Sequence, residues 1–214
     1  MAQTPKSIVY RPEIDGLRAI AVVAVILYHA DLDFFGTNLL SGGFLGVDIF
    51  FVISGYLITT ILVTGFRTGE LTLLQFYERR ARRILPLLLL VITTSIPLSW
   101  LLLLPSEFQA YSWQILSSIF SVSNFYFWGE DSYWATESIL KPFLHTWSLG
   151  IEEQFYLLLP CLVLVLHKHS QLRLAVVFFA LCSLIASQYM SDKDPQSSFY
   201  LLPFRAWELF LGAS

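Results

Sequence analysis

Long apolar runs alternate with short polar stretches along most of the chain. At about 20 residues per membrane-spanning helix, the pattern predicts spans at residues 17–35, 44–63, 84–104, 145–166 and 174–190, with another beginning within 199–214. Residues 108–128 are apolar but rich in Ser, Tyr and Trp, so either a span or a re-entrant segment is expected there. The apolar run still open at Ser214 suggests a truncated chain. The fold class predicted is all-α, a polytopic transmembrane helical bundle.

Composition supports a membrane protein. Hydrophobic residues make up 56% of the 214 residues and charged residues 14%, whereas an ordinary soluble domain is about 25% charged. The net charge of −3 gives no indication of a nucleic-acid partner. Cys161 and Cys182 both lie in apolar stretches and suggest neither a disulfide framework nor a zinc site, so no metal is expected.

The positions of Lys and Arg predict the orientation. Ten of the 13 fall in three stretches, with three in 1–18, five in 64–83 and two in 167–173. Loops rich in Lys and Arg face the cytoplasm, so a cytoplasmic N-terminus is expected, with the loops 31–43 and 129–141 outside. An even number of crossings must then separate the polar loop 64–83 from 167–173, which favours a re-entrant or outer-face position for 108–128.

Arg18 and His29 form the first group of ionisable residues within a predicted span, where charge is expensive. They are 11 residues apart, close to three helical turns, and therefore share one face about 16 Å apart. His29 is expected beyond the middle of its span, toward the outer side. A neutral imidazole there could accept a proton from a hydroxyl. A histidine that only bonds a neighbouring helix is an equally good interpretation.

The second group is the cluster Arg79, Arg80, Arg82 and Arg83, directly before an apolar run. Its simplest interpretation is a topology signal on the cytoplasmic side. The functional alternative is anion binding, because arginine forks suit phosphates. Arg80 and Arg83 would share a helix face at i, i+3.

The third group is Glu152 and Glu153, which open an otherwise apolar helix. Adjacent helical residues point about 100° apart, so only one of them should face a given cavity. Anchoring at the membrane interface, together with Trp147, is the alternative. Asp48 lies near the outer end of its predicted span and is a candidate structural partner for an arginine or a backbone group.

Taken in order, these segments resemble membrane acyltransferase family 3 over nearly the whole chain. The matching stretches are Tyr10–Ala21 with His29, Gly43–Ile58, Phe76–Pro86, His145–Tyr156 and Phe204–Glu208. Within them, Tyr56, His145, Trp147 and Ser148 are candidate structural or substrate-binding residues, together with Asp48.

The resemblance implies an O-acyltransferase of the bacterial inner membrane that moves acetyl from acetyl-CoA to sugars of cell-envelope polymers. It implies that Arg18 and His29 are the first-helix pair, with His29 catalytic, and that Arg80 and Arg83 engage the donor beside Arg79 and Arg82. His29 would either deprotonate the acceptor hydroxyl or relay the acetyl group. Glu152 or Glu153 would orient a catalytic group or bind the acceptor. The family's membrane domain has more helices than these 214 residues hold, and in many members a periplasmic SGNH-type domain follows.

Two other functions fit the same residues. In a transporter or flippase for lipid-linked or envelope glycans, the buried His, Arg and Glu would form a proton or substrate pathway. In a non-catalytic scaffold, they would only hold helices together.

Overall fold

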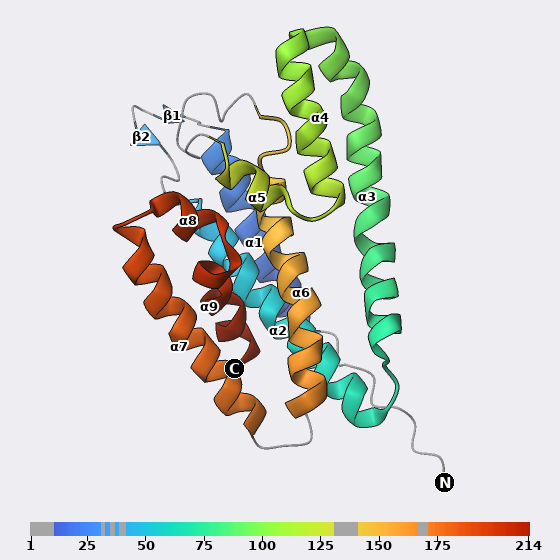
Figure 1. The fold of residues 1–214 in the computed structure, drawn as a ribbon, viewed down its shortest axis with the longest axis vertical. Coiled ribbons are helices and arrows are strands. Elements are labelled where there is room, and N and C mark those ends of the chain that lie inside the picture. Colours follow the sequence, from blue (N-terminus) through green and yellow to red (C-terminus); the bar gives the residue numbers. More distant parts are fainter. Residues whose placement is uncertain (1–10, 31–32, 35–36, 39–41, 131–140, 167–170) are drawn as a thin grey trace. The chain divides into compact units, whose positions relative to one another are not determined.

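The computed structural model describes residues 11–30, 33–34, 37–38, 42–130, 141–166 and 171–214 (Figure 1). Its helices are α1 (Pro12–His29), α2 (Leu45–Thr68), α3 (Leu73–Leu102), α4 (Pro105–Ile119), α5 (Ser123–Trp128), α6 (Thr146–Leu166), α7 (Gln171–Ser191), α8 (Pro195–Tyr200) and α9 (Leu202–Ala213). The strands β1 (Asp33–Phe34) and β2 (Thr37–Asn38) pair antiparallel. The predicted all-α class is confirmed, and this two-residue strand pair is the addition that the sequence did not predict.

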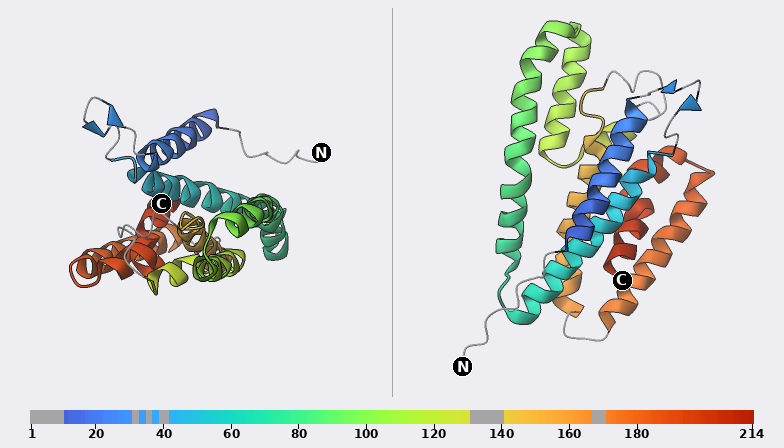
Figure 2. Two further views of the ribbon diagram at one scale, coloured as in Figure 1. Left: turned by 90° about the horizontal axis from the view of Figure 1, so that it is seen from above. Right: turned by 180° about the vertical axis from the view of Figure 1, so that it is seen from behind.

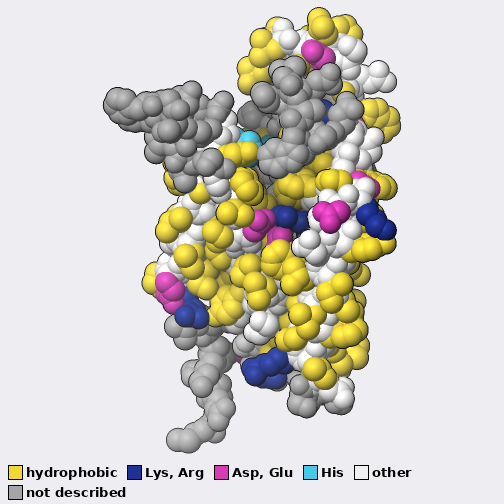
Figure 3. Space-filling view, turned by 90° about the vertical axis from the view of Figure 1, so that its left-hand side faces the viewer, with side chains coloured by type: hydrophobic (Ala, Val, Ile, Leu, Met, Phe, Trp, Pro, Cys, Tyr) yellow, Lys and Arg dark blue, Asp and Glu magenta, His cyan; other side chains and the backbone are white. Residues whose placement is uncertain are grey.

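Among the described residues, four helices are long and apolar enough to cross a membrane, namely α2, α3, α6 and α7. Their outward side chains are apolar, as for Leu101 on α3, Val165 on α6 and Ile185 on α7, which are 79%, 70% and 68% exposed. Hydrophobic side chains also form large patches on the described part of the face shown in Figure 3. Such surface suits lipid contact. Helix α1 is not among the four, and its 18 residues include three charges, Glu13, Asp15 and Arg18.

The first and third helices differ in their ends from the predicted spans. Helix α1 starts at Pro12, a favoured first helical residue, and ends at His29 rather than at 35. Helix α3 starts at Leu73 rather than at 84, because Thr72 and Gln75 exchange side-chain-to-backbone hydrogen bonds of 3.3 and 3.1 Å in a capping box. Helix α2 also extends to Thr68 instead of ending at 63, so the expected polar loop 64–83 is reduced to 69–72 and the arginine cluster lies on a helix.

The segment 108–128 is not one continuous helix. Helix α4 ends at Ile119, and α5 covers only six residues after the break. Ser121 in the break has a φ of 56°, a left-handed conformation that is uncommon for a residue with a side chain. Neither helix is among the four that could cross a membrane.

The chain divides into two compact units. Unit 1 comprises residues 1–70, 161–183 and 206–214, and unit 2 comprises 71–160 and 184–205. Helices α6, α7 and α9 each contribute residues to both units.

Unit 1 is packed through glycines that let helix backbones approach closely. Helix α1 runs alongside α2 (Figure 2), where a Cβ added to Gly46 would collide with the carbonyl of Ala21. Helix α9 meets α2 in the same way, since a Cβ on Gly55 would collide with the Leu209 carbonyl and one on Gly212 with the Val52 carbonyl. Small residues at such crossings are typical of membrane helix pairs, where van der Waals packing replaces the hydrophobic effect.

We expect Gly55→Ala to destabilise the protein by about 1–3 kcal/mol, because the backbone of Leu209 must shift to make room. Thermal unfolding in detergent micelles measures this change. Gly16→Ala is the matched control, since nothing lies within 4 Å of a Cβ at that helical position, and it should be neutral or stabilising. Equal unfolding temperatures for the two variants would show that α9 does not need this close approach.

Unit 2 has an apolar core between α3 and α4, which lie side by side in Figures 1 and 2. Leu88, Ile92, Tyr111 and Phe143 form its buried centre, and the hydroxyls of Ser95 and Tyr111 are 2.7 Å apart.

A polar cluster joins α5, α6 and α8. The Asn124 amide donates to the carbonyl of Tyr200 at 3.0 Å, and the Gln154 amide donates to Asn124 Oδ1 at 2.7 Å. Asp194 caps α8 by accepting from the Ser197 hydroxyl and backbone N–H, and these bonds lower the pKa of the Asp194 carboxyl. The cluster fixes the start of α6, where the predicted Trp147 and glutamates lie.

Candidate functional site

His29 is the last residue of α1 and is exposed. It was expected inside a longer span, but α1 ends at this residue. Its Nδ1 lies 2.8 Å from the carbonyl oxygen of Val25. A carbonyl can only accept, so Nδ1 carries the proton, and in the neutral ring the lone pair is on Nε2. The Tyr28 ring packs edge-on against the imidazole with centroids 5.2 Å apart.

Arg18 lies on the same continuous helix, three turns before His29. Its guanidinium carbon is 5.4 Å from the ring centroid of Phe50 on α2, a cation–π distance. Its Nε is buried without a hydrogen-bond partner among the described residues. A rise of 1.5 Å per residue puts about 16 Å between Arg18 and His29 along α1, so the two side chains lie far apart on one helix.

Tyr56 and Asp48 lie on α2. The Tyr56 hydroxyl accepts a 2.8 Å hydrogen bond from Arg11, a residue that the sequence did not single out for a role. Arg11 also pairs with Glu13 at 2.7 Å. The Glu13 backbone N–H and then Arg11 hold the pKa of the Glu13 carboxyl below its usual range. Asp48 is half-buried in the first turn of α2, where the helix dipole favours a carboxylate.

The arginine cluster and the glutamates meet in unit 2. Arg80 Nη2 donates to Glu153 Oε1 at 3.2 Å, and the Arg80 guanidinium lies 4.4 Å from the ring centroid of Tyr156. The Tyr156 hydroxyl in turn donates to Glu152 Oε2 at 3.2 Å. The side chains of Arg80 and Glu153 are 14% and 22% exposed, and Glu152 is buried. Three predicted site residues are thus connected. Arg80 bonds Glu153 directly, and Tyr156, which was not predicted as a site residue, links Arg80 to Glu152.

The other three arginines of the cluster are exposed on α3. Arg82 pairs with Glu78 at 2.7 Å, one helical turn away. Arg80 and Arg83 therefore differ in environment, although their spacing predicts a shared face. Arg80 is held against α6 by an ion pair, and the exposed Arg83 is accessible to an anion.

His145, Trp147 and Ser148 lie at the start of α6. Trp147 is buried, with its ring centroid 4.4 Å from that of Phe199 and 5.8 Å from the guanidinium of Arg205. The Ser148 hydroxyl donates to the backbone carbonyl of His145 at 3.1 Å, and the exposed His145 ring stacks on Phe143. These contacts hold the start of the helix in place.

Glu208 in α9 was not predicted as a site residue. It is 1% exposed, and both of its carboxylate oxygens are buried. Arg205 and Glu208 are the two charged residues of the apolar run 199–214. Charged residues within apolar runs were used to find the other candidates, because burying a charge is costly. The same criterion, used on this run, would have identified Arg205 and Glu208.

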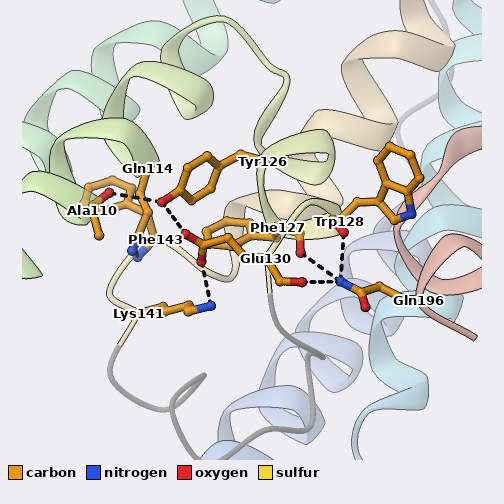
Figure 4. A network of polar contacts seen from close by, with 9 residues as sticks. All are labelled: Ala110, Gln114, Tyr126, Phe127, Trp128, Glu130, Lys141, Phe143 and Gln196. Atoms are coloured by element: carbon orange, nitrogen blue, oxygen red, sulfur yellow. Dashed lines mark hydrogen bonds and ion pairs between the residues drawn. The ribbon is translucent and has the colours of Figure 1, made fainter.

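A polar network in unit 2 includes Glu130 and Lys141 (Figure 4). Glu130 accepts from the Tyr126 hydroxyl at 2.6 Å and pairs with Lys141 at 2.6 Å. The Gln196 amide donates to the carbonyls of Trp128 and Glu130 at 2.8 and 2.6 Å. The described residues contain no group of three or more His, Cys, Asp or Glu that could hold a metal ion.

Comparison with known proteins identifies close relatives by sequence. The acyltransferase domain family matches residues 11–213. The O-acetyltransferase OatA of Staphylococcus aureus is 41% identical over 74% of this chain and 26% of that protein. The peptidoglycan O-acetyltransferase OatA of Listeria monocytogenes and the putative peptidoglycan O-acetyltransferase YrhL of Bacillus subtilis are 38% and 37% identical, over 96% of this chain and 33% of each relative. The chain thus spans about a quarter to a third of these curated relatives. No solved structure matches it.

Proposed function

Because the chain belongs to acyltransferase family 3, we propose that it acts in moving an acetyl group from cytoplasmic acetyl-CoA to a hydroxyl of a cell-envelope glycan. Peptidoglycan is the proposed acceptor, since two relatives carry that substrate in their names. The bilayer proposed is the bacterial plasma membrane, with the N-terminus in the cytoplasm, because Lys and Arg gather in 1–18, 64–83 and 167–173.

His29 is the proposed general base, and the hydrogen bond from its Nδ1 to the Val25 carbonyl is the observation that supports this role best. It directs the neutral lone pair to Nε2, which accepts the proton of the acceptor hydroxyl as that oxygen attacks the thioester carbonyl. The carbon–sulfur bond then breaks, and the imidazolium returns the proton to the leaving thiolate. The products are an acetyl ester and CoA. Arg18, on the same helix, is proposed to stabilise negative charge on a more distant part of a bound substrate.

The exposed arginines Arg79, Arg82 and Arg83 are proposed to contact the phosphates of the donor. Arg80 is proposed as a positioning residue, because its ion pair with Glu153 and its contact with Tyr156 fix α3 against α6. Glu152, joined to Tyr156, would be oriented by the same arrangement toward the acceptor.

Arg83→Lys tests donor binding against a topology signal. We expect it to raise KM for acetyl-CoA about tenfold, because lysine keeps the charge and loses the two-pronged contact with phosphate. Steady-state kinetics in membranes, with Lys193→Arg as the control outside the cluster, measures the change. An unchanged KM for acetyl-CoA would mean that the arginine cluster acts only as a signal for membrane orientation.

The transporter alternative is favoured by one observation, the ion pair Arg80–Glu153 between two helices that could cross the membrane. It requires glycan movement without acetyl-CoA.

A further inference from the structure

Unit 1 contains a pocket of about 460 Å³ at the ends of α2, α7 and α9. Its volume falls within the usual range of small-molecule sites. The residues lining it that carry the argument are Thr59, Val63, Arg67, Leu172, Arg173 and Val176. None of them belongs to the proposed acetyl-transfer site.

Two arginines give the pocket its charge. Arg67 lies in the last turn of α2 and Arg173 in the first turn of α7, and both side chains are exposed. Within the described part of the chain neither of them forms an ion pair. Two unpaired guanidinium groups at one pocket favour an anionic ligand, and phosphate oxygens match their fork geometry.

Thr59 supplies an independent indication of a ligand. The residue is only 8% exposed, and its Oγ1 is buried without a hydrogen-bond partner among the described residues. The next residue, Thr60, shows the usual alternative, because its hydroxyl donates to the Tyr56 carbonyl at 2.8 Å. A buried hydroxyl without a partner is unfavourable. Thr59 lines the pocket, so a ligand oxygen at this wall would supply the missing hydrogen-bond partner.

Apart from Ser214, the rest of the lining is apolar, formed by Val63, Leu172, Val176 and Ala213. The apolar surface continues along α7, where Leu174 and Phe178 are 70% and 58% exposed. A ligand with a phosphate at one end and an apolar body at the other therefore fits better than a fully soluble anion.

We propose that this pocket binds the headgroup of an anionic phospholipid. Arg67 and Arg173 contact the phosphate, and the Thr59 hydroxyl bonds an oxygen of the headgroup. Both arginines fall in stretches predicted to face the cytoplasm, and basic pockets between membrane helices on that side are suited to anionic headgroups.

Lipid titration of the purified chain in detergent micelles tests the proposal, with phosphatidylglycerol as the probe and phosphatidylcholine as the uncharged match. Native mass spectrometry measures the bound fraction. Phosphatidylglycerol should bind more tightly, and Arg67→Gln and Arg173→Gln should each weaken its binding about tenfold. Lys193→Gln, which removes an exposed cation outside the pocket and outside the proposed donor site, should leave it unchanged. Equal binding of the two lipids, or equal weakening by Lys193→Gln, would overturn the proposal.

Thr59→Val separates a ligand contact from a structural role. It preserves shape, so the unfolding temperature without lipid should stay the same or rise while phosphatidylglycerol binding weakens several-fold. Wild-type affinity in this variant would contradict the role given to the hydroxyl and with it the proposed site.

Coenzyme A, added as a competitor, distinguishes a lipid phosphate from a soluble one. It should not displace phosphatidylglycerol from the wild-type chain. Displacement that depends on Arg67 and Arg173 would assign the pocket to a soluble phosphorylated ligand and exclude the lipid.

Discussion

His29→Ala is expected to lower the rate of acetyl transfer about a hundredfold to ten-thousandfold, the usual contribution of a general base. The loss should fall on kcat more than on KM for acetyl-CoA, because the imidazole acts on the proton that moves in the transition state. Initial rates of acetyl transfer, measured in membranes at equal protein levels, give both constants.

Tyr28→Phe is the matched control for His29→Ala. It retains the ring that packs edge-on against His29 and removes only a hydroxyl, so it should keep most of the activity. A His29→Ala protein with near-normal kcat would exclude His29 as the base. Its role would then be structural, at the end of α1.

Arg80→Met is expected to destabilise the protein by about 3–5 kcal/mol, because it leaves Glu153 mostly buried without its cation. Removing both charges in Arg80→Met/Glu153→Gln should restore part of that loss. A double-mutant cycle on unfolding in mixed micelles gives the coupling energy between the two side chains.

Arg82→Met is the control for this cycle. Arg82 and its partner Glu78 are 79% and 53% exposed, and pairs exposed to that degree contribute about 0–1 kcal/mol. Equal destabilisation by Arg80→Met and Arg82→Met would mean that the contact between α3 and α6 does not depend on the ion pair.

The helical fold could be predicted because apolar runs of membrane length are visible in the sequence alone. Helix ends were predicted less well. The charged arginines led to the prediction that the span begins only after them, at residue 84. The capping box at Thr72 instead starts α3 11 residues earlier, so the helix carries the arginine cluster on its surface. Helix α1 stops at His29, which moves the proposed base from the interior of a span to its end.

The arrangement of the site could be predicted only in part. Periodicity places Arg80 and Arg83 on one helix face, but it cannot tell which of them meets a neighbouring helix. Arg80 and Glu153 are 73 positions apart in the chain. Their pairing depends on how α3 and α6 are aligned along each other. A single sequence does not show that alignment, so the ion pair and the contact of Tyr156 with Arg80 could be identified only from the structure.

Acetyl transfer itself is tested most directly with acetyl-CoA carrying one isotope in the acetyl group and another in the CoA moiety. The donor is supplied to the cytoplasmic face of membrane vesicles containing the protein and an envelope glycan. The acetyl label alone should enter the glycan, as an ester released as acetate by mild alkali. Glycan that crosses the membrane without acquiring the acetyl label would contradict the acyltransferase account and support a transporter.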